Sequence, residues 1–260
     1  MKSALILEGG GGRGAYQVGA YRALLEAGYH FDRIVGASIG ALNGCMFVMG
    51  AIDKTEELWR SLDTATIFGE EAQPLNDLYE KNKWLEKAQA LKDSALLMIR
   101  EQGISVEPLL SLIRHYVDEE AVRSAQCDFG LTTLNISKKK GMELLIDEIP
   151  QGALPEFLLA SCYLPIFKSI KICGDYYLDG GFYKGIPLSM AGDDFEELVV
   201  IGLHEDFLRY RGVEADPRCL LIRPQEALSG TMYFSPELSG AHIAQGYRDA
   251  QEVLKKVRKK

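Results

Sequence analysis

Phe31-Asp-Arg-Ile-Val-Gly-Ala-Ser-Ile-Gly-Ala-Leu-Asn-Gly44 predicts a strand that turns sharply into a helix. At its centre, Gly36-Ala-Ser38-Ile-Gly40 fits G-x-S-x-G, the elbow that lifts a serine hydroxyl out of a sheet. Glycines suit this bend because a side chain on either side of the serine would crowd a strained backbone. The helix would also direct its free N–H groups at the serine. An ordinary tight turn remains the alternative interpretation.

A second glycine-rich segment precedes this elbow. Ser3–Leu7 is an apolar run typical of a buried parallel strand, and Gly9-Gly-Gly-Gly-Arg-Gly14 follows it. Apolar spacing then predicts a helix from about Ala15 to Ala27, ahead of the strand Phe31–Val35. Together these segments predict a βαβ unit with a right-handed crossover.

The glycine loop allows two functional interpretations. Gly9-x-Gly11-x-x-Gly14 matches the dinucleotide fingerprint, although Asp32 lies at the start of the second strand, where an acidic residue is expected at its end. In the other interpretation, the amides of Gly10, Gly11 and Gly12 form an oxyanion hole. Only an oxyanion hole explains why a serine elbow follows on the next strand.

Composition narrows the class of protein. The 260 residues suffice for one large α/β domain or two small ones, and a hydrophobic content of 47% is that of a globular protein. The net charge of −8 argues against a nucleic-acid partner, which needs a basic surface. Five cysteines without a C-x-x-C pair predict reduced thiols and no zinc site. No apolar run is long enough for a membrane span or a signal peptide, so we expect a cytoplasmic protein.

We expect a single domain over residues 1–260, with no linker or internal repeat. Within it, residues 51–125 form a helical insertion that either caps the serine or packs as plain structure, and 205–260 form a C-terminal extension. Residues 51–102 are helical and charged, with breaks at Gly69 and Pro74. The remaining predicted elements are a helix over Ile104–Val117, hairpin strands over Asp128–Ile136 and Met142–Ile146, a helix over Gly152–Cys162, two short strands around Gly174-Asp175, buried strands over Glu197–Gly202 and Cys219–Arg223, and a helix over Ser239–Lys260.

A serine hydroxyl needs a base within hydrogen-bonding reach to act as a nucleophile. Of the four histidines, His204 has the most suitable position, after the strand Glu197–Gly202, and Ser38, Asp179 and His204 follow the chain order of α/β-hydrolase triads. Asp179 is the rival base, because a buried carboxylate with a raised pKa can accept the proton directly. Gly180 and Gly181 leave its carboxylate unshielded, although Asp-Gly is also a common turn pair.

Three segments together resemble the signatures of the patatin-like phospholipases: Leu7-Glu-Gly-Gly-Gly-Gly-Arg-Gly14, Gly36-Ala-Ser-Ile-Gly40 and Asp179-Gly-Gly181. Ala160-Ser-Cys-Tyr-Leu-Pro-Ile-Phe167 is similar to a further segment of that family, and the resemblance covers roughly residues 4 to 203. It implies a three-layer α/β/α fold with a mainly parallel sheet, a Ser38–Asp179 dyad and hydrolysis of lipid acyl esters. One departure is Lys184-Gly-Ile-Pro187, where the family usually has Asn-x-Pro.

The resemblance also implies the roles of the surrounding residues. Gly10, Gly11 and Gly12 would form the oxyanion hole, and no metal or cofactor would be needed. The residues that would support the motifs are Gly9, Arg13, Gly14, Gly36, Gly40, Gly180 and Gly181.

We therefore expect a serine acyl hydrolase whose partner is a lipid or ester, with transient contact to a membrane surface and an oligomeric state left open. The alternatives are an esterase that uses His204, a nucleotide-binding module, and a non-catalytic relative that binds lipid or protein. Arg13 suits a phosphate in the second case and a surface salt bridge in any of them.

Overall fold

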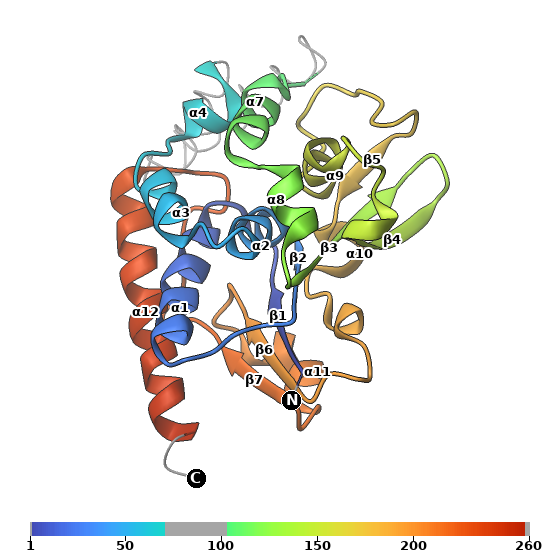
Figure 1. Cartoon of the computed structure of the whole chain (residues 1–260). Coiled ribbons are helices and arrows are strands. Elements are labelled where there is room, and N and C mark those ends of the chain that lie inside the picture. The colour runs from blue at the N-terminus through green and yellow to red at the C-terminus, as the bar shows by residue number, and fades with distance from the viewer. Residues whose placement is uncertain (1, 71–102, 258–260) are drawn as a thin grey trace.

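The computed structural model describes residues 2–70 and 103–257 and is built around a seven-stranded sheet (Figure 1). Its strands are β1 (Ser3–Leu7), β2 (Arg33–Ala37), β3 (Asp128–Asn135), β4 (Lys140–Leu145), β5 (Tyr177–Asp179), β6 (Glu197–Ile201) and β7 (Cys219–Ile222). The order is β4-β3-β2-β1-β6-β7, and β5 pairs with β3. Five strands are parallel, while β4 and β5 run antiparallel to β3. The sheet is therefore mainly parallel, as expected.

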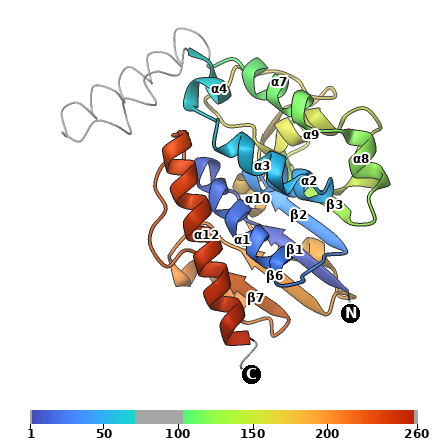
Figure 2. The ribbon, with the colours of Figure 1, turned by 60° about the vertical axis from the view of Figure 1, so that its left-hand side comes forward.

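Helices flank both faces of this sheet. The α-helices are α1 (Ala15–Glu26), α2 (Ile39–Val48), α3 (Ile52–Trp59), α4 (Thr64–Phe68), α7 (Glu107–Tyr116), α8 (Glu119–Ser124), α9 (Leu154–Ser161), α10 (Gly181–Lys184), α11 (Arg211–Glu214) and α12 (Pro236–Val257), and the 3₁₀ turns are η1 (Gly11–Gly14), η3 (Ile146–Glu148), η4 (Leu188–Ala191) and η5 (Phe207–Tyr210). Figure 2 shows α1, α2 and α12 in front of the sheet. Among the helical segments of residues 2–70 and 103–257, the short elements η4, η5 and α11 contribute to the core on the opposite face.

The central strand β1 shows why both faces must be covered. All five of its residues are buried, and successive side chains enter opposite cores. Leu5 and Leu7 belong to the large core beneath α1, α2 and α9, whereas Ala4 and Ile6 pack with residues of η4 and α11. The expected three-layer α/β/α fold is confirmed, with one thick and one thin helical layer.

Several predicted boundaries need correction. The second strand spans Arg33–Ala37 where we expected Phe31–Val35, because its register on β1 begins with Ala4 opposite Arg33. The two short strands expected around Gly174-Asp175 do not form a hairpin of their own. An isolated bridge joins Ile172 to Asp175, and β5 pairs with β3.

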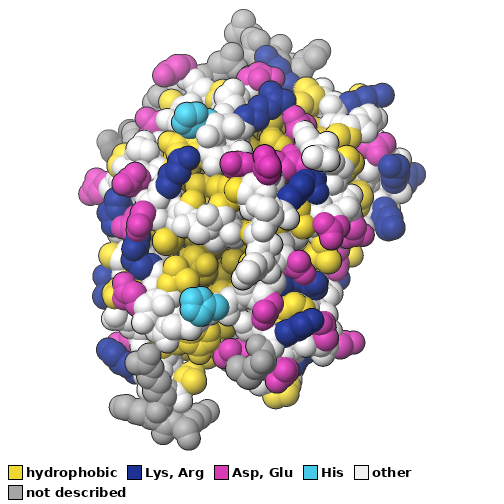
Figure 3. Space-filling view, in the orientation of Figure 1, with side chains coloured by type: hydrophobic (Ala, Val, Ile, Leu, Met, Phe, Trp, Pro, Cys, Tyr) yellow, Lys and Arg dark blue, Asp and Glu magenta, His cyan; other side chains and the backbone are white. Residues whose placement is uncertain are grey.

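The helical predictions are better met. The last helix begins at Pro236, three residues before the predicted start, and the helix expected from Ile104 begins at Glu107 with a proline in its first turn. In the predicted insertion, α3 and α4 are helical, while residues 71–102 lie outside the described residues. On the face shown in Figure 3, hydrophobic side chains gather where α1, α2 and α3 come forward, with charged side chains around them.

Helices α1 and α12 pack along each other at unusually close range (Figures 1 and 2). A methyl group on Gly246 of α12 would lie 2.0 Å from the carbonyl oxygen of Tyr16, and one on Gly19 of α1 would lie 1.9 Å from that of Ile243. Neither position has room for a side chain, so these two glycines set the distance between the helices.

Replacing Gly246 with alanine should therefore lower the free energy of unfolding by about 1–3 kcal/mol, the usual cost of overpacking. The sign is informative because alanine normally stabilises a helix interior by roughly 1 kcal/mol over glycine. Gly240 of the same helix is the matched control, since its added methyl would meet only the mobile end of Arg60, at 3.1 Å. Urea unfolding should show a lower free energy of unfolding for Gly246→Ala and no such decrease for Gly240→Ala. Equal effects of the two substitutions would contradict the close approach of α1 and α12.

Candidate active site

Ser38 lies at the turn between β2 and α2 in a strained conformation. Its φ of 54° and ψ of −127° are rare for a residue with a side chain. A methyl group on Gly36 would lie 2.3 Å from the carbonyl of Gly40, and one on Gly40 would lie 2.5 Å from the carbonyl oxygen of Leu7. The elbow therefore requires both glycines, in agreement with the expectation from G-x-S-x-G.

The register of β3 brings a distant carboxylate to this serine. Ala37, at the end of β2, pairs with Thr132, and Asp179, at the end of β5, pairs with the next residue, Thr133. Strands β2 and β5 thus follow one another along the same edge of β3. As a result, the Ser38 hydroxyl donates a hydrogen bond of 2.5 Å to Oδ2 of Asp179, 141 positions away in the sequence.

Asp179 has the environment of a base that works near neutral pH. Its side chain is only 5% exposed, and burial raises its pKa to about 6. Hydrogen bonds from Ser38 and from the Gly181 amide, at 2.7 Å from Oδ1, partly oppose that rise. The carboxylate is therefore ionised at pH 7, yet much more basic than an exposed aspartate.

Ser161, at the end of α9, holds both halves of this pair. Its hydroxyl accepts a hydrogen bond from the Ser38 amide at 2.9 Å and donates one to the carbonyl of Thr132 at 2.8 Å. Its own carbonyl accepts the Gly180 amide. The sequence segment Ala160–Phe167 had drawn attention to this region, but the positioning contacts of Ser161 were not foreseen, because they depend on where α9 meets β3.

The glycine loop lies beside Ser38. A methyl group on Gly9 would be 3.2 Å from the Ser38 Cβ, and Gly11 and Ser38 line the same cavity. The Gly9 amide donates to the carbonyl of Gly185 at 3.1 Å, and the Gly12 amide donates to that of Thr231 at 2.9 Å. The Gly12 amide is thus already engaged within the fold, which leaves Gly10 and Gly11 as candidate oxyanion donors.

The packing around the glycine loop argues against a bound dinucleotide. Methyl groups on Gly11 and Gly12 would lie 2.0 Å and 2.4 Å from the carbonyl oxygens of Thr231 and Gly230, so a later chain segment packs directly on the loop. Asp32 is also occupied, since its Oδ2 accepts the Ser3 amide at 2.8 Å.

His204 lies on the other side of the glycine loop, among charged groups. Its Nδ1 is 3.1 Å from Nη1 of Arg13, and its Nε2 is 3.9 Å from Oε1 of the buried Glu8. Burial, together with the nearby Arg209 and Arg13, lowers its pKa. Among the described residues, the Ser38 hydroxyl donates its hydrogen bond to Asp179 and not to His204.

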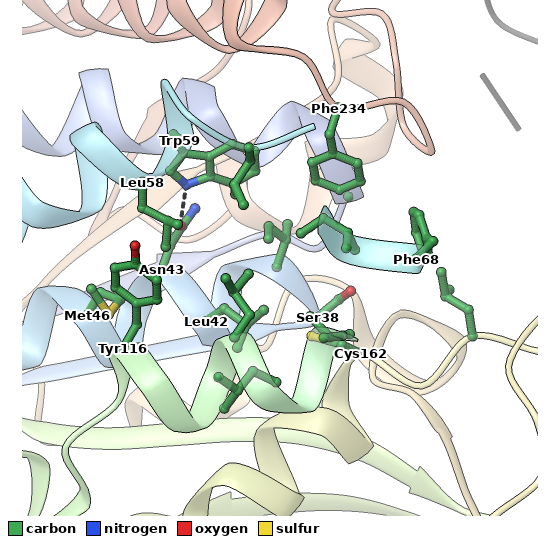
Figure 4. Close-up of a pocket in the computed structure, with 18 of the residues that line it drawn as sticks. Ser38, Leu42, Asn43, Met46, Leu58, Trp59, Phe68, Tyr116, Cys162 and Phe234 are labelled. Atoms are coloured by element: carbon green, nitrogen blue, oxygen red, sulfur yellow. Dashed lines mark hydrogen bonds between the residues drawn. The ribbon is translucent and has the colours of Figure 1, made fainter. Parts of the chain in front are cut away.

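An apolar pocket extends from Ser38 along α2, beneath α3, α4 and α7 (Figure 4). The space between its walls, counted out to the open mouth, is about 830 Å³. Leu42 lies between Ser38 and the far end, where Met46 and Tyr116 come together. Most of the other lining residues are aliphatic or aromatic, among them Leu58, Trp59, Phe68, Leu112, Cys162 and Phe234. Such walls suit a hydrocarbon chain.

Across residues 2–70 and 103–257, no group of three or more His, Cys, Asp or Glu side chains is placed to hold a metal ion. In the same part of the chain, no helix combines the length and the apolar character that a bilayer span requires.

A serine hydroxyl on a strained strand–helix elbow, with a buried carboxylate as its hydrogen-bond acceptor, has the geometry of a group that can attack a carbonyl carbon. Comparison with known proteins gives the family. Residues 5–191 match the family model of the patatin-like phospholipases. The chain belongs to the patatin-like phospholipase family, whose members are lipid ester hydrolases.

Individual relatives agree with this assignment. The chain is 39% identical over 217 residues to an uncharacterized NTE family protein of Mycobacterium tuberculosis, covering 82% of this chain and 50% of that protein. It is 53% identical over 47 residues to Lysophospholipase nte1 of Aspergillus terreus, covering 18% of this chain and 3% of the relative. The chain thus spans half or less of these relatives. The structure of VipD from Legionella pneumophila has the same fold, with a TM-score of 0.59 at 14% identity, covering 98% of this chain and 67% of VipD.

The raised pKa of Asp179 predicts that the wild-type protein is less stable than a neutral variant at high pH. Folding shifts this pKa from 3.8 to about 6, so the folded state binds the proton more tightly, and stability is lost as pH rises between these values. Asp179→Asn should raise the free energy of unfolding at pH 8 by on the order of 3 kcal/mol. The gain should vanish below about pH 4, where wild-type Asp179 is protonated in both states. Urea unfolding of both proteins at pH 8 and below pH 4 measures this difference in stability. A gain that is the same at both pH values would show that the raised pKa of Asp179 is not its cause.

Proposed function

We propose that this protein hydrolyses the carboxylic ester bonds of phospholipids or related lipids through a Ser38–Asp179 dyad. The observation that carries the proposal is the 2.5 Å hydrogen bond from a strained serine hydroxyl to a buried carboxylate, at one end of an apolar pocket. The family assignment supports the same chemistry.

In the first half of the reaction, Oγ of Ser38 attacks the ester carbonyl carbon while its proton passes to Oδ2 of Asp179. The amides of Gly10 and Gly11 donate to the carbonyl oxygen as it becomes negative, and each such donor contributes roughly 10²–10³ in rate in well-studied hydrolases. Collapse of the tetrahedral intermediate breaks the ester bond. The leaving alcohol takes the proton from Asp179, and the acyl group stays on Ser38.

In the second half, Asp179 takes a proton from a water molecule that adds to the acyl–serine carbonyl. The same amides hold the second oxyanion, and its collapse releases the carboxylic acid and returns the proton to Ser38. These steps balance without a metal or cofactor. They also give no role to His204.

The pocket supports an acyl chain as the part of the substrate that is bound. Because the walls between Ser38 and Tyr116 are apolar, the chain would lie along α2 with the polar head group outside. A lipid is therefore the proposed partner. The protein would act on it at a membrane surface in the cytoplasm, as a single domain over residues 1–260.

Covalent labelling with a fluorophosphonate, combined with hydrolysis of p-nitrophenyl butyrate, tests the dyad. Ser38→Ala should abolish labelling, and both Ser38→Ala and Asp179→Asn should lower kcat/KM by a factor of roughly 10⁴ or more. His204→Ala serves as the control and should lose less than about tenfold, since removal of a true general base costs about 10²–10⁴. A wild-type protein that neither labels nor hydrolyses would favour a non-catalytic lipid-binding role, and large loss in His204→Ala would favour the triad.

The depth of the pocket predicts a preference for longer acyl chains that depends on Met46. Met46 lies eight positions after Ser38 along α2, a rise of about 12 Å. Met46→Trp should fill the far end and reduce kcat/KM for p-nitrophenyl laurate by about tenfold or more, because several methylenes lose their contacts. Met46→Leu is the matched control and should retain activity. Both variants should hydrolyse the butyrate ester at the wild-type rate. If Met46→Trp lowers activity on both esters, or on neither, the acyl chain does not follow this path.

A further inference from the structure

Three large apolar side chains are exposed close to the proposed catalytic pair. Phe182 is 58% exposed, Phe207 50% and Leu208 57%. Phe182 lies in α10, three positions after Asp179, and the other two lie in η5, which follows β6. Isolated exposed apolar residues are ordinary, but a group of them beside a catalytic site indicates a contact surface.

The Arg209 side chain and the backbone of Gly185 connect these two segments to each other and to the nucleophile. A methyl group on Gly185 would lie 3.7 Å from Nη2 of Arg209, the residue that follows Leu208. The same methyl group would lie 3.8 Å from the Cα of Gly181, next to Phe182. The Gly185 carbonyl accepts the amide of Gly9, which packs on Ser38. The segments that carry Phe182 and Arg209 thus approach each other beside the proposed site.

Arg209 gives this region a fixed positive charge. Its Nε donates to Oε1 of the fully buried Glu8, while the side chain remains 43% exposed. Glu8 is held in turn by the amide of Leu203 at 2.6 Å and the hydroxyl of Tyr210 at 2.5 Å. The guanidinium is therefore anchored at one end and accessible at the other, which suits contact with a phosphate group.

We propose that Phe182, Phe207 and Leu208 enter the surface of a lipid bilayer and bring the Ser38–Asp179 pair to its substrate, with Arg209 facing the lipid phosphates. The proposal rests on the proposed function. A bilayer is the occupant favoured by the observations, because the pocket at Ser38 has apolar walls and three large apolar side chains are exposed in α10 and η5. The net charge of −8 means that general electrostatic attraction to acidic lipids cannot supply the affinity. Apolar insertion must do so.

Flotation with phosphatidylcholine vesicles tests the surface directly. The wild type should float with the vesicles, and the triple variant Phe182→Ser, Phe207→Ser, Leu208→Ser should bind about tenfold more weakly or worse, since three large apolar contacts are lost. Val257→Ser is the matched control, because Val257 is 44% exposed at the far end of α12. Binding should change little between 0.1 and 0.5 M salt. Arg209 is left intact, since its removal would leave Glu8 buried without its cation.

Activity measurements separate this proposal from the proposed function. The triple variant should hydrolyse vesicle phosphatidylcholine about tenfold more slowly than the wild type, yet cleave water-soluble p-nitrophenyl butyrate at an unchanged rate, which also shows that it is folded. A wild type that cleaves the soluble ester but does not float, or a triple variant that floats as well as the wild type, would overturn the surface and leave the hydrolase standing. If the wild type cleaves neither substrate yet floats through these side chains, the proposed function fails and the lipid-binding surface remains.

Discussion

The pairing of two strands along one edge of β3 is the constraint on which the site depends. Thr132 and Thr133 are consecutive, and they pair with the last residue of β2 and the last residue of β5. Backbone pairing therefore places Ser38 and Asp179 side by side, and their side chains meet in a hydrogen bond of 2.5 Å. A shift of one residue in either strand would turn its side chains to the opposite face of the sheet and separate the pair. The short strand β5, three residues long, therefore sets the position of the carboxylate.

The same pairing is costly to the folded state. Burial of Asp179 raises its pKa to about 6, and Ser38 has a φ of 54°, so both groups are held in states that an unfolded chain avoids. The restraint comes from Ser161, which binds the Ser38 amide and the carbonyl of Thr132 at once. Strain of this kind persists only where the surroundings over-determine the geometry. At this site the restraining groups are themselves anchored in β3 and α9.

How much of the fold and the candidate site could be predicted from the sequence depends on how far apart in the sequence the contacting residues lie. The elbow at Ser38, the first βαβ unit and the mainly parallel sheet follow from local patterns of glycine and apolar residues, and they are confirmed. The pairing of β5 with β3 could not be predicted, because Tyr177–Asp179 is too short to show a period and its partner lies over 40 residues away. The engagement of the Gly12 amide by Thr231 was missed for the same reason. No local pattern links positions more than 200 residues apart.

Residues beyond the region matched by the family model complete the site. Leu203 and Tyr210 hydrogen-bond the carboxylate of Glu8, which immediately precedes the glycine loop, and Thr231 accepts the Gly12 amide from within that loop. Phe234 closes part of the pocket. Its backbone amide donates a hydrogen bond of 3.0 Å to the hydroxyl of Thr64, which holds it in place. The C-terminal extension thus holds the backbone of the glycine loop and forms one wall of the apolar pocket. Since the buried Glu8 would be uncompensated without these contacts, the glycine loop cannot keep this geometry unless the extension is folded on it.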